Sequence, residues 1–360
     1  MLSQNLFYNF VQSYGHFIID RYFSLLKMMR NSVHYIKIKI HLFSLILIFF
    51  LLGCFASDKK TRVILDTDAN NELDDQHAIA YMLFNRDYFQ VEGITVNRTF
   101  NGGDIEKHYE EAERIVKLCS LYSEIKIHRG ANDSFEKITT NFEKNDFDGH
   151  EAVDFIIAEA KKPSNDKLVL LPVGKLTNIA LAIYKDPSII PTIRIVWLGS
   201  NYPEPGEYNQ VNDPSSLQYI LNTNVHFEIA IVRYGKPSGT DAVRALLSDI
   251  EKRMPGKGPN ISEAVRGRHG NYFSNFGDYS VNLFRNIELV GNPPSRALFD
   301  MAAVAIVKDP SWAKSNKIPS PELIDGKLKD RPDHPGHLTI WENFERDKIM
   351  EDFFSTMSAE

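Results

Sequence analysis

The pattern of hydrophobic and polar positions predicts alternating strands and helices after residue 61. Apolar runs of strand length occur at 62–66, 91–96, 124–129, 167–173, 193–199 and 227–233. Amphipathic stretches typical of helices lie between most of them, at 74–84, 104–119, 149–162, 176–185 and 213–222. Strands that alternate with helices favour a parallel sheet covered on both faces. We therefore predict an α/β fold, with an open, mostly parallel sheet and a Rossmann-like core, in a single domain over 62–355.

The N-terminal part of the chain follows a different pattern. The apolar run LFSLILIFFLL spans 42–52, and the bases Arg30, Lys37 and Lys39 precede it without an intervening acid. Its eleven residues are too few to cross a bilayer, which needs about 20 residues. A basic region followed by a short apolar run is typical of a secretory signal. The run ends in LLGC at Cys54, which resembles the lipobox of bacterial lipoproteins.

This pattern predicts a leader over 1–54 and a tether over 55–61. We expect an exported protein of the bacterial cell envelope, attached to the membrane by a lipid anchor at Cys54. A plain signal peptide or a signal anchor is the alternative. A misassigned start is an alternative explanation for residues 1–27, which are left out of the fold prediction.

Composition narrows the classes of partner. The chain has 360 residues, of which 43% are hydrophobic and 24% are charged, and this is ordinary globular composition. Its net charge of −6 argues against a nucleic-acid polymer as partner, because phosphate binding needs a basic face. Small nucleosides carry no phosphate and stay possible. The two cysteines, Cys54 and Cys119, allow neither a disulfide framework nor a Cys-based zinc site.

One short stretch, VILDTDANNELDDQHAIA at 63–80, concentrates carboxylates where the first predicted strand ends. Asp66 and Asp68 alternate at the strand end, and Asp74 and Asp75 follow after a short loop. Capping of the next helix explains one acid, not the whole concentration. Ca²⁺ takes six to eight oxygen ligands, and open α/β sheets bind ligands beyond the carboxyl ends of their strands. The stretch therefore predicts a site for a hard cation such as Ca²⁺ beyond the carboxyl end of this strand.

Four motifs, in order along the chain, resemble the nucleoside hydrolase family (ribonucleoside N-glycosidases of the inosine–uridine type). They are D-x-D-x-x-x-x-x-D-D at 66–75, LLPVGKLTNIALAIYKDPSI at 170–189, GEYNQVNDPSSLQYIL at 206–221 and RALFDMAAVAIVKDPS at 296–311. The resemblance runs from about Arg62 to near Asp347. It implies the family's fold and the calcium-dependent hydrolysis of ribonucleosides to ribose and free base. Family members are commonly dimers or tetramers, so it also implies a homo-oligomer.

The resemblance implies a metal-binding role for residues from three of the motifs. The implied Ca²⁺ ligands are the side chains of Asp68, Asp75 and Asp300 and the backbone carbonyl of Val173. Asp68 would also act as general base toward a water molecule. Asp66 would orient the loop rather than touch the metal.

The implied substrate contacts come from the same motifs and one loop. Asp74 and Asn209 would each hold a ribose hydroxyl, and Glu207 would reach the 5′ side. Asn101, in TFNGGD, matches a ribose-contacting Asn of the family only after a one-residue insertion. Asn178 would stabilise the turn that presents the carbonyl of the metal site.

One departure from the family concerns the leaving base. Phe299 occupies the position where the best-known members have a His that protonates the base, and His269 and Tyr279 are candidates to replace it. A non-catalytic nucleoside- or riboside-binding lipoprotein of the same fold is therefore the main alternative. A haloacid-dehalogenase-like phosphatase also opens with a strand and D-x-D. That class needs Thr or Val two residues after the second Asp, where this chain has Asn70.

Overall fold

The computed structural model describes residues 60–140, 142 and 146–358, together with residues 21 and 24. The part of the chain from Lys60 onward forms one compact unit. The predicted leader, the lipid attachment at Cys54 and most of the predicted tether lie outside the described residues. Within the described part of the chain, no helix is both long and apolar enough to cross a membrane.

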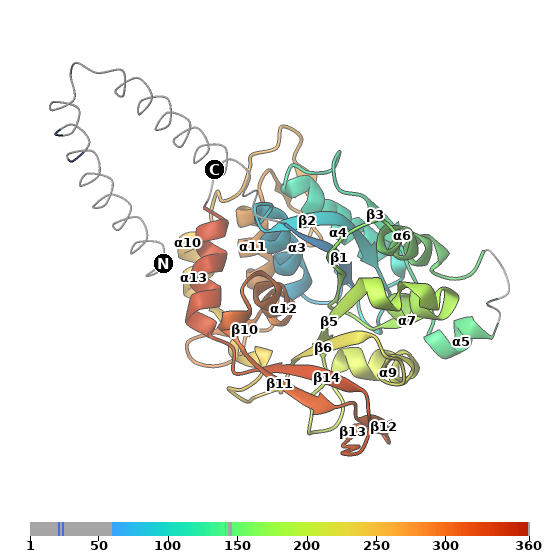
Figure 1. The fold of residues 1–360 in the computed structure, drawn as a ribbon. Helices are drawn as coiled ribbons and strands as arrows, with labels where there is room; N and C mark the ends of the chain where they lie inside the picture. The colour runs from blue at the N-terminus through green and yellow to red at the C-terminus, as the bar shows by residue number, and fades with distance from the viewer. Residues whose placement is uncertain (1–20, 22–23, 25–59, 141, 143–145, 359–360) are drawn as a thin grey trace. The chain divides into compact units, whose positions relative to one another are not determined.

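An eight-stranded sheet forms the centre of the fold (Figure 1). The strands follow the order β11 (Lys314–Pro319), β14 (His337–Glu342), β6 (His226–Ile231), β5 (Ile193–Gly199), β4 (Leu168–Pro172), β1 (Thr61–Thr67), β2 (Phe89–Val96) and β3 (Ile127–Arg129). Every neighbouring pair is parallel except β11 with β14. Strands buried on both faces are continuously apolar, as in β4, where every residue is buried. The predicted fold class is confirmed.

Helices cover both faces of the sheet. Val63 and Leu65 of β1 pack into one hydrophobic core and Ile64 packs into the other, because successive side chains of a strand point to opposite faces. The first core includes side chains of α3 (Asp74–Phe84), α4 (Ile105–Leu118), α10 (Leu247–Arg253), α11 (Phe276–Arg285), α12 (Phe299–Lys308) and α13 (Arg346–Thr356). The second includes side chains of α5 (Phe135–Thr139), α6 (His150–Ala160), α7 (Thr177–Lys185) and α9 (Pro214–Leu221).

The five predicted helices agree with the structure to within two residues at each end, and the predicted strand that departs most from the structure is the one at 124–129. The run at 124–129 forms a strand only over Ile127–Arg129, because the N–H of Glu124 bonds the carbonyl of Leu121 in a turn. The pattern also missed β11 and β14 of the main sheet and the short strand pairs outside it. The short pairs are β7 (Arg244–Leu246) with β10 (Ser295–Ala297), β8 (Val265–Arg266) with β9 (Tyr272–Phe273), and β12 (Glu322–Ile324) with β13 (Lys327–Lys329).

Candidate functional site

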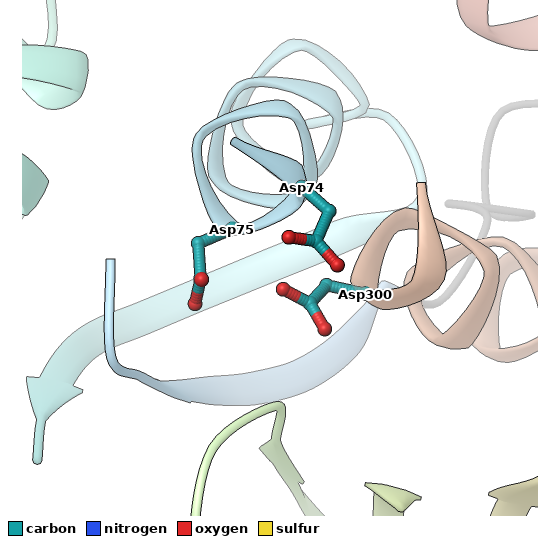
Figure 2. Close-up of side chains that lie close together, drawn as sticks. All are labelled: Asp74, Asp75 and Asp300. Carbon is teal, nitrogen blue, oxygen red and sulfur yellow. The ribbon is translucent and has the colours of Figure 1, made fainter. Parts of the chain in front are cut away.

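Carboxylates from distant parts of the chain meet beyond the carboxyl end of β1. Asp74 and Asp75 lie in the first turn of α3, and Asp300 lies in the first turn of α12. One carboxylate oxygen from each lies within 4.8 Å of those of the other two, and Figure 2 shows the three side chains converging from the two helices. The partial positive charge at a helix N-terminus favours acidic side chains there. The fold therefore brings together three of the acids that the sequence predicted for one site.

The other acids of the stretch sit beside this group. Asp68 follows β1, and its side chain lies so close to Gly174 that a Cβ there would be 2.8 Å from Oδ1. Thr99 Oγ1 donates to Asp68 Oδ2 at 2.5 Å, and Thr67 Oγ1 donates to Asp75 Oδ1 at 2.5 Å. Among the described residues no other side chain donates a hydrogen bond to these four carboxylates, which belong to Asp68, Asp74, Asp75 and Asp300. We call these four residues the acid cluster.

Asp66 differs from the acid cluster, because its carboxylate is fully provided with donors. It accepts hydrogen bonds from Thr95 Oγ1 at 2.6 Å, Asn97 Nδ2 at 2.9 Å and Asn178 Nδ2 at 2.6 Å. This arrangement agrees with an orienting role for Asp66. Asn178 also bonds the carbonyl of Val96, so its side chain fixes Asp66 and the end of β2. The prediction that it stabilises the turn after β4 is wrong.

Burial and mutual repulsion make the acid cluster costly to charge. Burial raises the pKa of Asp68 to about 7, and the nearby charges of Asp66 and Glu72 add to the shift. The pKa of Asp74 rises to about 8, through burial first and the charge of Glu72 second. Burial and the neighbouring carboxylates also hold the pKa of Asp75 and Asp300 well above the usual range. Buried charge of one sign needs a compensating partner, so the cluster is suited to a cation.

Oxygen is the ligand type that this cluster offers, and it suits a hard cation such as Ca²⁺. The carbonyl oxygen of Val173, which directly follows β4, lines the same cavity and accepts a hydrogen bond from Asn209 Nδ2 at 2.7 Å. A carbonyl oxygen has two lone pairs, so this hydrogen bond leaves one for a metal ion. The ligands implied by the sequence therefore lie around one cavity.

The cavity has a volume of about 260 Å³ and also contains the predicted substrate residues Asp74, Glu207 and Asn209. Glu207 is the N-cap of α8 (Tyr208–Asn212), and its oxygens accept from the backbone N–H of Ser200, Asn209 and Gln210. Burial raises the pKa of Glu207 to about 7. The carboxylate thus forms part of the cavity wall and holds Asn209 in place. The sequence had predicted only a substrate contact for Glu207.

Asn101 is the predicted site residue that the structure does not bring to this cavity. It lines a neighbouring cavity with Arg268 and His269, and its backbone N–H donates to the hydroxyl of Tyr208 at 2.8 Å. The two cavities share Asn71, Glu72 and Arg296 as a common wall. Asn101 therefore lies next to the cavity of the acid cluster without lining it.

The residues proposed for the leaving base take different positions. Phe299 lines the cavity and packs edge-to-face on Tyr234, with ring centroids 5.7 Å apart. His269 lines only the neighbouring cavity. Tyr279 is fully buried and donates to Glu111 Oε1 at 2.6 Å. The suggestion that Tyr279 acts on the base is therefore wrong, because its proton is committed inside the protein.

Several cavity residues were not predicted from the sequence. Tyr234, Asp241, Arg244 and Arg296 also line the cavity. Arg296 lies within one of the recognised motifs, next to Ala297, but nothing in its spacing distinguishes it from a surface residue. Arg244 lies outside the recognised motifs, and the pairing of β7 with β10 places it opposite Ala297.

A mostly parallel sheet with this acid cluster beyond the carboxyl ends of its strands is typical of a metal-dependent α/β protein. The family model for inosine-uridine preferring nucleoside hydrolases matches residues 63–334, so the chain belongs to that family. The resemblance stated from the sequence motifs is confirmed.

Curated relatives of the chain include an inosine-uridine preferring nucleoside hydrolase from Crithidia fasciculata, 26% identical over 194 residues. That match covers 51% of this chain and 55% of the relative. A pyrimidine-specific ribonucleoside hydrolase RihB from Escherichia coli O17:K52:H18 is 28% identical over 174 residues, covering 46% and 50%. The chain thus spans about half the length of the curated relatives it matches.

Solved structures share the fold over most of the chain. A plant nucleoside hydrolase has a TM-score of 0.64 at 17% identity, covering 84% of this chain and 100% of that one. An inosine-uridine preferring nucleoside hydrolase from Bacillus anthracis has a TM-score of 0.58 at 16% identity, covering 82% and 99%. Identities this low establish the likeness of fold alone.

Proposed function

We propose that the chain is a calcium-dependent hydrolase of the N-glycosidic bond of ribonucleosides. The observation that carries this proposal is the acid cluster: four buried carboxylates with two side-chain donors among them, around one cavity. Structural carboxylates are normally paired or hydrogen-bonded. Membership of the family supports the reaction, and the oxygen-only donor set supports the cation.

We assign Ca²⁺ to the side chains of Asp68, Asp75 and Asp300 and the carbonyl of Val173. When bound, the cation would offset the repulsion of the carboxylates, orient a ribose diol and acidify a water molecule. Asp74 would accept a hydrogen bond from one ribose hydroxyl. Asn209 would form a hydrogen bond with another. The carboxylate of Glu207, already committed to the cap of α8, would keep Asn209 in place and face the 5′ side.

The residues then have distinct tasks in bond cleavage. The C1′–N bond breaks with its electron pair going to the base nitrogen, and the sugar develops oxocarbenium character. The negative charges of Asp68 and Asp74 stabilise that positive charge electrostatically. Asp68 takes a proton from the water that attacks C1′, as a general base. The departing base takes up a proton from solvent and Asp68 releases its proton to solvent, so the products are ribose and the free base.

A turnover assay tests this proposal. Purified protein is given a panel of purine and pyrimidine ribonucleosides, with added Ca²⁺ or with a chelator, and released ribose is measured. We expect turnover that the chelator abolishes and Ca²⁺ restores. Binding of ribosides without any turnover would overturn the proposal in favour of a non-catalytic binding protein.

We also propose export and a lipid anchor at Cys54, on the basis of the basic residues and the apolar run before it. Cys54→Ser should block processing or release the protein from the membrane fraction. Unchanged processing and partitioning would reject the anchor. A homo-oligomer is proposed on family resemblance alone, and the mass of the purified protein in solution tests it.

A further inference from the structure

The side of the cavity that would receive the base has no residue suited to protonate it. The acid cluster and Asn209 would hold the ribose, so a base attached at C1′ points toward the remaining wall. Among the described residues that line the cavity there is no histidine. Phe299 has no proton to give. Burial and the charge of Glu207 raise the pKa of Tyr234, which makes its hydroxyl a weaker acid than usual.

This wall does contain positive charge. Arg244 and Arg296 both line the cavity, but they form ion pairs with different carboxylates. Arg296 pairs with Glu72, and its charge lowers the pKa of Asp74, so it belongs to the acid-cluster side. Arg244 pairs instead with Asp241, which also lines the cavity and is not a member of the acid cluster.

The guanidinium of Arg244 is anchored at one end and has donors to spare. Its Nη2 donates to Asp241 Oδ1 at 2.5 Å, and Asp241 Oδ2 accepts from the backbone N–H of Gly235 at 2.8 Å. The carboxylate of Asp241 is thereby fixed between a turn and the guanidinium. Among the described residues, no acceptor bonds Nε or Nη1 of Arg244. The side chain is 29% exposed, so these donors can reach a ligand in the cavity.

We propose that Arg244 is a catalytic residue of the leaving-group side, which stabilises a base that departs as an anion. This inference rests on the proposed function. The electron pair of the C1′–N bond goes to the base nitrogen, and the charge spreads to a ring carbonyl oxygen. The guanidinium donates a charge-assisted hydrogen bond to that acceptor. The water gives its hydroxyl to C1′ and its proton to Asp68, and the released anion takes a proton from solvent.

The chemistry of arginine fits the stabilisation of an anionic base and excludes general-acid catalysis. Its pKa lies above 12, so it cannot act as a general acid at neutral pH. A fixed positive donor can still stabilise charge that develops in the transition state without reorganising. A hydrogen bond from Arg244 favours bases with a carbonyl oxygen conjugated to the departing nitrogen, because negative charge delocalises onto that oxygen. It explains how a chain with Phe299 could cleave nucleosides.

Leaving-group dependence tests the proposal. The variants are Arg244→Met, Arg244→Lys and Asp241→Asn, with Arg285→Met as control, because Arg285 is 61% exposed and does not line the cavity. Each is assayed with Ca²⁺ on uridine and inosine, and on p-nitrophenyl β-D-ribofuranoside. The last probe releases a nitrophenolate that is stable without help. Circular dichroism and a thermal melt establish that each variant is folded.

We expect Arg244→Met to lower kcat for uridine and inosine by about 100-fold or more, the usual scale for loss of one such donor, and for the nitrophenyl riboside by less than about 5-fold. Arg244→Lys should recover part of the loss, and Asp241→Asn should show a smaller loss with the same substrate pattern. Equal losses on all substrates, or no loss, would overturn the role of Arg244. If the wild type cleaves uridine or inosine, the proposed function stands whatever the Arg244 variants show. If the wild type cleaves none of these substrates, both proposals fall.

Discussion

Two buried groups of acidic side chains, Glu228 in the sheet and the acid cluster beyond its strand ends, differ in the number of hydrogen-bond donors around them. Glu228 of β6 accepts from Arg194 Nε at 2.6 Å, His226 Nε2 at 2.8 Å and Trp341 Nε1 at 2.6 Å. Burial raises its pKa, but the hydrogen bonds from His226, Arg194 and Trp341 outweigh burial and lower the pKa to about 2. The acid cluster is as deeply buried and has two side-chain donors for four carboxylates.

This difference in donors indicates a structural role for Glu228 and a functional role for the acid cluster. The fold is able to surround a buried carboxylate with donors, as it does at Glu228 and at Asp66. Leaving the acid cluster short of donors costs stability, and such a cost persists where a ligand or a reaction needs the free groups. Substitutions in the two regions should therefore separate stability from activity.

The largest expected effect is on activity. Asp68→Asn keeps an oxygen at the site but removes the base and one negative charge. We expect kcat for a hydrolysed nucleoside to fall by at least about 100-fold, the lower scale of general-base loss, while riboside binding persists through Asp74 and Asn209. Steady-state kinetics and calorimetric titration measure the two quantities. Asp87→Asn, an exposed carboxylate after α3, is the matched control and should keep full activity.

The next effect is on stability, at the other region. Glu228→Gln leaves Arg194 and His226 without their shared anion, and we expect it to lower the free energy of unfolding at pH 7 by about 3 kcal/mol. The kcat should not change, because Glu228 is not among the cavity residues. Urea denaturation and kinetics on the same preparation measure both. A variant with normal stability would show that the paired region contributes nothing.

The pH dependence of stability gives a second measurement of the same pair. The folded pKa of Glu228, about 2, lies below its ordinary value of 4.5, so its contribution is full above about pH 4.5 and is lost as pH falls toward 2. Across this window the wild type should lose more stability than Glu228→Gln, and the two unfolding curves should converge. Parallel curves from pH 5 to 2 would contradict the shift.

Addition of Ca²⁺ should stabilise the protein through the acid cluster and not through Glu228. At a free Ca²⁺ concentration 100 times the dissociation constant, we expect the folded state to gain about 2.7 kcal/mol. Thermal melts with increasing Ca²⁺ measure the gain. Asp300→Asn should lose most of it, whereas Glu228→Gln should keep it. An equal response in both variants would place the cation elsewhere.

The sequence predicted the parts of this comparison that depend on local patterns. The carboxylates at Asp66, Asp68, Asp74 and Asp75 stand out because a strand, a loop and a helix follow one another within a few residues. The five helices between the predicted strands were placed closely because amphipathic spacing is a local property. Asp300 could be assigned only through the family motif, since nothing local connects α12 with a strand that ends more than 200 residues earlier.

The remaining site residues depend on contacts that no spacing encodes. Arg244 reaches the cavity through the pairing of two three-residue strands, which are too short to give a periodic signal. Asn101 lines the neighbouring cavity, in a loop whose backbone contacts Tyr208 far along the chain. Glu207 was predicted as a substrate contact, but its three backbone partners follow from the local turn into α8.

The smallest effect is the most direct test of why the acid cluster exists. Asp300 is buried beside Asp74 and Asp75, and burial with their charge holds its pKa well above the usual range. A raised folded pKa means that the charged form costs stability as pH rises. In the presence of chelator at pH 8, Asp300→Asn should therefore raise the free energy of unfolding by on the order of 1 kcal/mol, although it weakens Ca²⁺ binding. Urea denaturation with chelator measures the change, and Asp87→Asn is again the control. A loss of stability instead would mean that Asp300 has a structural partner, and the cluster would then resemble the Glu228 region rather than oppose it.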